Sequence, residues 1–174
     1  GNKSATVKAT FKFEANEAGY PIFDSVAKPF KVTVDGVGVQ YGTTAVPGNV
    51  STVRYAKSSV NVGFHTISIW TKIEKGTKFN WRGVSSGFFI KDLSDRMFLE
   101  RYVPANYEYD QYPMTFNVKI SGTKKRHRIF ANGDVREFRS NEFQVKFPSS
   151  YTASSVYFHL VPKRKFWKLY FNYK

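Results

Sequence analysis

The chain has 174 residues, and its 27 Lys and Arg against 13 Asp and Glu give a formal net charge of +14. Aromatic residues make up 18% of the sequence, which excludes a chain that is disordered throughout, because such chains are poor in aromatic and β-branched residues. The absence of cysteine excludes a disulfide scaffold, thiolate metal sites and cysteine nucleophiles, and no apolar run is long enough for a membrane-spanning helix.

Alternating apolar and polar residues predict strands in the first 84 residues. Apolar side chains occupy the odd positions from Val7 to Phe13, and the even positions are polar. Because successive side chains of a strand point to opposite faces, this pattern predicts one buried and one solvated face. The alternation recurs at Phe30, Val32 and Val34, where Asp35-Gly36 follows as a strong signal for a two-residue hairpin turn.

Two further strands are predicted in this part of the chain. One contains Val53, and a longer one covers residues 64–73. In the longer strand Ile67 and Ile69 would lie on one face, and Phe64 and Trp70 on the other. Aromatic or aliphatic residues on both faces lead us to expect that both are covered.

The same pattern recurs after residue 113. Asn132-Gly133 stands between two short apolar runs, so we predict a hairpin there. Residues 88–102 depart from the pattern: their spacing predicts a short helix, with a strand at 97–102 as the alternative. Strands are predicted at 114–120, 129–130, 135–138, 143–147, 156–160 and 166–173.

These elements predict an all-β protein, because short strands separated by turn residues are typical of sandwiches and barrels. We expect an antiparallel β-sandwich architecture with two small immunoglobulin-like sandwiches packed together. One larger jelly-roll sandwich is the alternative. The predicted boundaries are an N-terminal sandwich at 1–84, a connecting segment with a short helix at 85–113, and a basic C-terminal sandwich at 114–174.

The sequence contains no recognisable catalytic or metal-binding motif. His65, His127 and His159 have no carboxylate at a metal-ligand spacing. We therefore predict a non-enzymatic protein without catalytic residues, metal or cofactor. A hydrolase is the alternative, and it would require a pocket that joins His65 or His159 to Glu108 or Asp110.

A tyrosine-rich loop at 104–113 is the first candidate binding site. Tyrosine offers a flat apolar face and a hydroxyl group with little loss of rotamer entropy, a combination suited to recognising sugars or peptides. Two alternatives remain: the tyrosines cover the core, or the two carboxylates serve acid–base chemistry or bind calcium. The candidate ligand-binding residues are Tyr107, Glu108, Tyr109, Asp110 and Tyr112.

The basic residues of the last third form the second candidate site. Residues 121–174 hold 12 basic and 3 acidic groups, and such an excess favours nucleic acid, anionic polysaccharide or another acidic partner. The alternative is protection of a strand edge and solubility. The candidate polyanion-binding residues are Lys124, Lys125, Arg126, Arg128, Lys163, Arg164, Lys165 and Lys168.

Together these features predict a recognition, adhesion or assembly protein that is secreted or associated with a cell surface. Its expected partner is a protein or polysaccharide surface, and binding of polyanions or nucleic acid through the basic last third is the alternative. The sequence begins at Gly1 rather than Met, so we expect any signal peptide to have been removed. The oligomeric state is left open, and no family signature is recognised.

Overall fold

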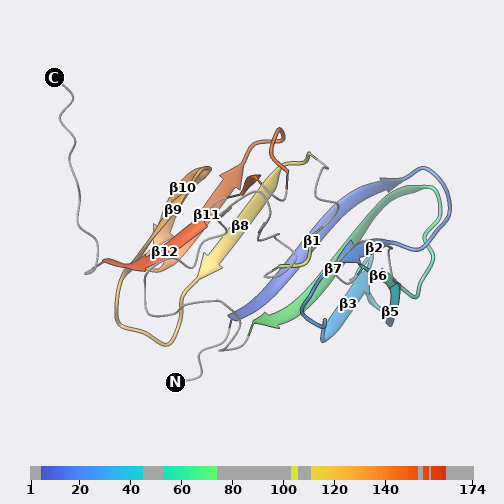
Figure 1. The fold of residues 1–174 in the computed structure, drawn as a ribbon, viewed down its shortest axis with the longest axis horizontal. Coiled ribbons are helices and arrows are strands. Elements are labelled where there is room, and N and C mark those ends of the chain that lie inside the picture. Colours follow the sequence, from blue (N-terminus) through green and yellow to red (C-terminus); the bar gives the residue numbers. More distant parts are fainter. Residues whose placement is uncertain are drawn as a thin grey trace, which may run out of the picture.

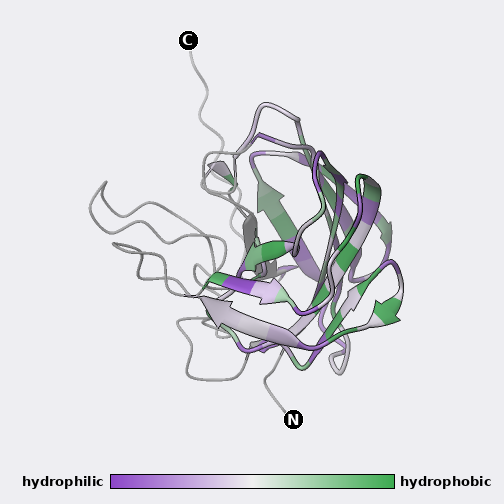
Figure 2. Cartoon of the chain, turned by 90° about the vertical axis from the view of Figure 1, so that its right-hand side faces the viewer, coloured by the Kyte–Doolittle hydropathy of each residue, from purple (hydrophilic) through white to green (hydrophobic). Residues whose placement is uncertain are grey.

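The computed structural model is all-β and confirms the predicted fold class (Figure 1). The described residues form twelve strands, every described pair of strands is antiparallel, and this part of the chain contains no α-helix. Figure 2 shows hydrophobic and hydrophilic segments following one another along the strands. The structure describes residues 5–44, 53–73, 103–105, 111–152, 155–156 and 158–163.

The N-terminal half is built on one long strand pair. Strand β1 (Ala5–Ala15) pairs with β7 (Gly63–Ile73) along its whole length. Two short strands, β3 (Lys31–Val34) and β4 (Val37–Gly38), complete a sheet of order β1-β7-β3-β4. A second sheet of order β2-β6-β5 contains β2 (Ile22–Asp24), β6 (Val53–Ala56) and β5 (Tyr41–Thr44).

Apolar side chains from both N-terminal sheets form one buried cluster. Ile67 and Ile69 of β7 and Val32 of β3 meet Phe23 of β2 and Ala56 of β6. The Ile67 and Ile69 face of β7 is therefore buried, as expected for this face. Burying this apolar surface is the main favourable term in folding, at roughly 25 cal/mol per Å².

The other face of this sheet departs from expectation. Phe64 is 82% exposed, so the prediction that both faces are covered is wrong at this position. Phe30 is also exposed, although its alternation with Val32 predicts a buried side chain. Phe30 precedes the first residue of β3, so it lies outside the strand whose pleat would direct it inward.

The predicted hairpin at Asp35-Gly36 is confirmed. The two residues join β3 to β4 and have φ angles of 49° and 84°. Two-residue hairpins favour turns with positive φ at both central positions, because this twist matches that of the flanking strands. The local sequence therefore determines this turn.

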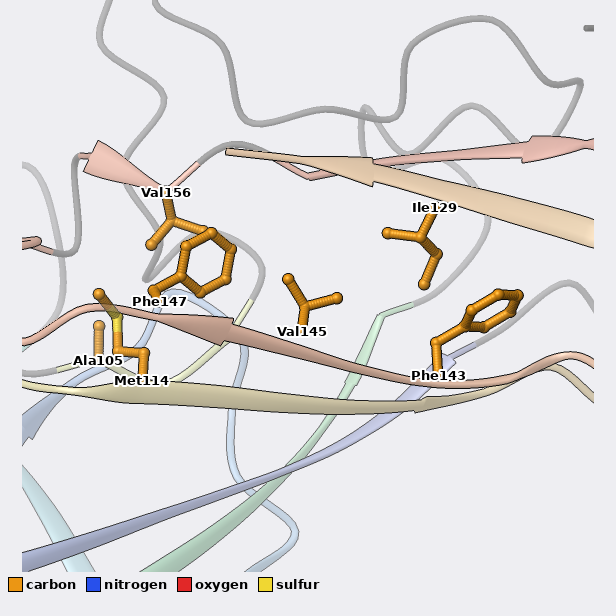
Figure 3. Close-up of a cluster of buried hydrophobic side chains, with 7 residues drawn as sticks. All are labelled: Ala105, Met114, Ile129, Phe143, Val145, Phe147 and Val156. Carbon is orange, nitrogen blue, oxygen red and sulfur yellow. The ribbon is translucent and has the colours of Figure 1, made fainter. Parts of the chain in front are cut away.

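The C-terminal half also has two sheets. Strands β10 (Asp134–Arg139), β11 (Glu142–Phe147) and β8 (Met114–Lys119) form a sheet of order β10-β11-β8, and β9 (His127–Ala131) pairs with β12 (Phe158–Pro162). The side chains of Phe143, Val145 and Phe147 point from β11 toward the opposite sheet (Figure 3). The buried cluster comprises Ala105, Met114, Ile129, Phe143, Val145, Phe147 and Val156.

The predicted hairpin at Asn132-Gly133 is wrong. Strands β9 and β10 belong to different sheets, so these residues carry the chain from one sheet to the other. A Cβ atom at Gly133 would lie 2.4 Å from the carbonyl oxygen of Lys146. Glycine is therefore required for close approach to β11. The hairpin in this region instead lies between β10 and β11, where Asn141 adopts a φ of 66°.

Residues 103–105 connect the two halves. Ala105 exchanges two backbone hydrogen bonds with Asp24 at the edge of β2, each 2.9 Å long. Its side chain belongs to the C-terminal cluster. The helix or strand predicted at 88–102 lies outside the described residues, as does the strand predicted at 166–173.

Candidate functional site

The two basic segments of the last third lie side by side. Strands β9 and β12 run antiparallel with Pro162 opposite His127, so the segment before β9 and the residue after β12 lie at the same end. The backbone N–H of Lys163 donates to the carbonyl oxygen of Arg126 at 2.8 Å. Cations that are far apart in the sequence thus form one local group.

Asn141 fixes the backbone on both sides of Arg126. Its Nδ2 donates to the carbonyl oxygen of Lys125 at 2.9 Å, and its Oδ1 accepts from the N–H of His127 at 2.8 Å. The residue is buried, and asparagine tolerates the left-handed backbone found here. The Nε of Arg126 also donates to Ser140 Oγ at 3.2 Å. The neighbouring turn therefore preorganises the basic segment.

A cavity of about 260 Å³ opens beside this segment. Its positive wall consists of Arg126, Arg128 and Lys163, and Glu137 of β10 contributes a carboxylate. Phe130 adds an apolar surface. The lining contains three cations and one carboxylate, and this positive excess attracts anions and raises their local concentration. The sequence pattern does not single out Glu137 or Phe130 as site residues, and Glu137 reaches the cavity only through the contact of β10 with β9.

This side-chain set is suited to binding an anion. A guanidinium group presents donors in a planar fork that matches carboxylate, sulfate and phosphate oxygens, and an ammonium group supplies a compact point charge. The cavity is slightly smaller than the roughly 300–1,000 Å³ of typical small-molecule sites. It therefore suits one anionic group together with the residue that carries it.

Two of the other predicted cations, Lys124 and Lys125, do not line this cavity. Lys124 and Lys125 are exposed in the turn before β9, as expected for a basic surface segment. Arg164, Lys165 and Lys168 lie outside the described part of the chain, so their role in binding a polyanion remains a prediction.

The tyrosine-rich loop is described only at its two ends, residues 104–105 and 111–113. Tyr112 is half-buried and packs against the C-terminal cluster, and its N–H donates to the carbonyl oxygen of Tyr151 at 3.3 Å. The candidate residues outside the described part of the chain are Tyr107, Glu108, Tyr109 and Asp110. Their binding role remains a prediction.

A histidine–carboxylate pair occurs in the N-terminal half. His65 Nδ1 lies 2.7 Å from Asp35 Oδ2, and His65 Nε2 lies 2.9 Å from the carbonyl oxygen of Asn61. Both partners are acceptors, so an imidazolium satisfies both contacts by donating from each nitrogen. The hydrogen bond to Asp35 raises the pKa of His65, and the same bond lowers the pKa of Asp35.

This pair is a structural feature of the hairpin. Asp35 Oδ1 also accepts the backbone N–H of Thr66 at 2.8 Å, which ties the turn to β7. Because both imidazole nitrogens are already bonded, His65 has no free nitrogen to serve as a general base in this arrangement. The sequence shows Asp35 only as a turn residue, and its contact with His65 depends on the pairing of β3 with β7.

The described residues lack two other kinds of feature. This part of the chain contains no group of three or more His, Cys, Asp or Glu side chains arranged to hold a metal ion. It also contains no helix that is both long and apolar enough to cross a membrane.

Comparison with known proteins relates the chain to others through its fold alone. No protein-family model matches the sequence, and no curated protein matches it. The structure is similar to native leukotriene A4 hydrolase from Saccharomyces cerevisiae, with a TM-score of 0.63 and 10% sequence identity. The match covers 91% of this chain and 26% of the hydrolase chain, so this chain corresponds to about a quarter of that protein.

Proposed function

We propose that this protein is a non-enzymatic recognition module that holds an anionic group of its partner in the basic cavity of the C-terminal half. One observation carries the proposal: the backbone bond between Lys163 and Arg126 brings two separate basic segments to one wall of the cavity. Solubility alone is served by charges that are spread over the surface. Here the basic groups lie close together, although like charges repel one another.

The proposed partner is an acidic polysaccharide or an acidic protein surface, encountered outside the cell or at its surface. Nucleic acid is the second candidate, because Phe130 lies beside the cations and base stacking on aromatic residues accompanies phosphate binding in many such proteins. The two candidates differ in the group that follows the anion into the cavity: a sugar or amino acid in one case and a base in the other.

The test compares two double variants that lose the same charge. Arg126→Gln with Lys163→Gln removes cations from the cavity, and Arg139→Gln with Lys146→Gln removes exposed cations elsewhere in the same half. Binding of a heparin oligosaccharide, an acidic peptide and an oligothymidylate is measured by calorimetry at two salt concentrations. We expect the cavity variant to weaken binding about tenfold, as for the loss of two ionic contacts, and the matched variant to change it far less.

Each outcome decides the proposal. Preferred binding of the oligothymidylate favours the nucleic-acid candidate. Equal losses in both double variants would show attraction by net charge alone and overturn the cavity as the site. The same conclusion follows if no probe binds at low salt.

A further inference from the structure

The outward face of the N-terminal sheet gathers lysines that are scattered in the sequence. In the paired strands, Lys8 of β1 and Lys31 of β3 both lie opposite Trp70 of β7. Directly opposite residues of neighbouring strands share a face, so these three side chains form one row across the sheet. Lys12 lies on the same face, four residues and roughly 13 Å along β1 from Lys8.

The first row holds two ammonium groups around one indole ring. Lys8 Nζ lies 5.0 Å from the centre of the Trp70 ring, and Lys31 Nζ lies 4.8 Å from it. The ring attracts cations through its quadrupole and so positions both side chains. Both lysines are exposed, and neither pairs with a carboxylate of the described residues. A bound anion would neutralise this pair of charges.

A row of hydroxyl groups crosses the sheet beside the lysines. Thr10 of β1 and Thr33 of β3 both lie opposite Ser68 of β7. Thr10 Oγ1 lies 2.9 Å from Ser68 Oγ, and Thr10 is exposed while the other two are mostly covered. Beside its bond to Ser68, the exposed hydroxyl of Thr10 still has an acceptor lone pair for a ligand.

An exposed aromatic ring marks the far end of the same face. Phe64 is six residues from Trp70 along β7, or roughly 20 Å, and it is 82% exposed. Glu14 lies opposite Phe64. The face thus carries cations at one end, hydroxyls beside them, and an apolar ring with one carboxylate at the other end. Its length suits an extended polymer.

We propose that this outward face, defined by Lys8, Lys31, Trp70, Thr10, Lys12 and Phe64, binds a linear acidic polysaccharide lying along β1, where Lys8, Thr10 and Lys12 are exposed. The ammonium groups would take its carboxylate or sulfate groups, Thr10 its hydroxyls, and Phe64 the apolar face of a sugar ring. This surface is separate from the basic cavity, and the inference does not depend on the proposed function of that cavity.

The arrangement favours a polysaccharide over nucleic acid. A single strand is held by bases stacked on aromatic rings next to cations that neutralise its phosphates. The aromatic ring beside the cations, Trp70, is already engaged by Lys8 and Lys31.

The experiment measures binding of the whole chain to alginate and heparin oligosaccharides, with neutral dextran and an oligothymidylate as comparison probes. Lys8→Gln with Lys31→Gln removes the paired ammonium groups and keeps most of each side chain. We expect about a tenfold weaker affinity for the acidic oligosaccharides, the effect of losing two exposed ionic contacts, and a several-fold loss for Phe64→Ala. Circular dichroism checks that both variants fold, as their exposed positions predict.

The matched control is Lys57→Gln with Lys146→Gln, two exposed lysines outside this face. Unchanged affinity in the control, with a loss in the Lys8 and Lys31 variant, supports the proposal. Equal losses in both, absence of binding to both acidic oligosaccharides, or tighter binding of the oligothymidylate overturns it. The Arg126 and Lys163 variant tests the cavity separately, because it leaves the outward face intact.

Discussion

The two halves of the molecule carry basic residues in different ways. In the N-terminal half, lysines from two strands form a row on the outward face of a sheet. In the C-terminal half, cations at the ends of β9 and β12 line a cavity. Residues 1–60 hold only 7 basic and 4 acidic groups, so a count along the chain directs attention to the last third alone. Strand register determines where charge gathers on the surface.

The cores differ as well. Five of the six buried polar residues among those described lie in the N-terminal half: Ser25, Thr33, Arg54, Ser68 and Thr71. The sixth, Asn141, supports the basic segment of the C-terminal half. The N-terminal half thus buries more polar side chains than the described C-terminal half, although Ser68 and Thr33 lie on the outward face of its sheet. Substitutions in each half test this difference.

The largest effect is expected from Phe147→Ala in the C-terminal cluster. Phe147 is 3% exposed, and its ring packs edge-on against Phe116 with centroids 5.6 Å apart. The cavity left behind should lower the free energy of unfolding by about 3–5 kcal/mol, measured by chemical denaturation. Amide hydrogen exchange should accelerate in β8 and β11 more than in β7. Uniform acceleration along the chain would show that the two clusters unfold as one unit.

The next effect is expected from Arg54→Leu in the N-terminal half. Arg54 is 5% exposed, its Nε donates to the carbonyl oxygen of Ser25 at 3.0 Å, and its Nη1 donates to Thr43 Oγ1 at 3.2 Å. Loss of these bonds leaves a buried acceptor unsatisfied and should cost about 1–3 kcal/mol in denaturation experiments. Arg136→Leu, at an exposed position, serves as the control and should change stability by about 0.5 kcal/mol or less.

A smaller effect of opposite sign is expected from Thr71→Val. Thr71 is fully buried, and its Oγ1 has no hydrogen-bond partner among the described residues. Replacing this hydroxyl by a methyl group of similar shape removes the cost of burying it, so we expect the melting temperature to rise with a gain of about 1 kcal/mol. A lower melting temperature would mean that the Thr71 hydroxyl stabilises the N-terminal core, although it has no hydrogen-bond partner among the described residues.

The smallest effect is a pH dependence confined to the N-terminal half. The pKa of His65 is raised above its ordinary value of 6.5. Its contribution to the stability of the fold is therefore complete below pH 6.5 and is lost as the pH rises through the folded-state pKa. The pKa of Asp35 is lowered from its ordinary value of 3.8. Its contribution to the stability of the fold is therefore present above pH 3.8 and is lost as the pH falls through the folded-state pKa.

The pair should therefore stabilise the hairpin most between the two ordinary pKa values, near pH 5. Asp35→Asn should lower the denaturation midpoint most at that pH and progressively less as the pH rises above the folded-state pKa of His65. Nuclear magnetic resonance titration of His65 in both proteins provides the direct check. An equal loss of stability at every pH would assign the role of Asp35 to its bond with Thr66.

The local features of this protein follow from its sequence alone. Alternation along 7–13 predicted which side chains face inward, and along 64–73 it predicted which side chains share a face, because the pleat reverses direction at every residue. Asp35-Gly36 determined its own turn, because both residues tolerate positive φ. The residues that line the basic cavity were predicted in part, through the runs of Lys and Arg that contain Arg126, Arg128 and Lys163.

The pairing of strands depends on the tertiary structure. The residues around Asn132-Gly133 look like a hairpin, yet they pass between two sheets because β11 and β12 supply better partners for β10 and β9. The same non-local pairing places Lys8 and Lys31 beside Trp70, and His65 beside Asp35. A period of two fixes the face on which a side chain lies but not the strand next to it, since pairing depends on contacts between distant parts of the chain.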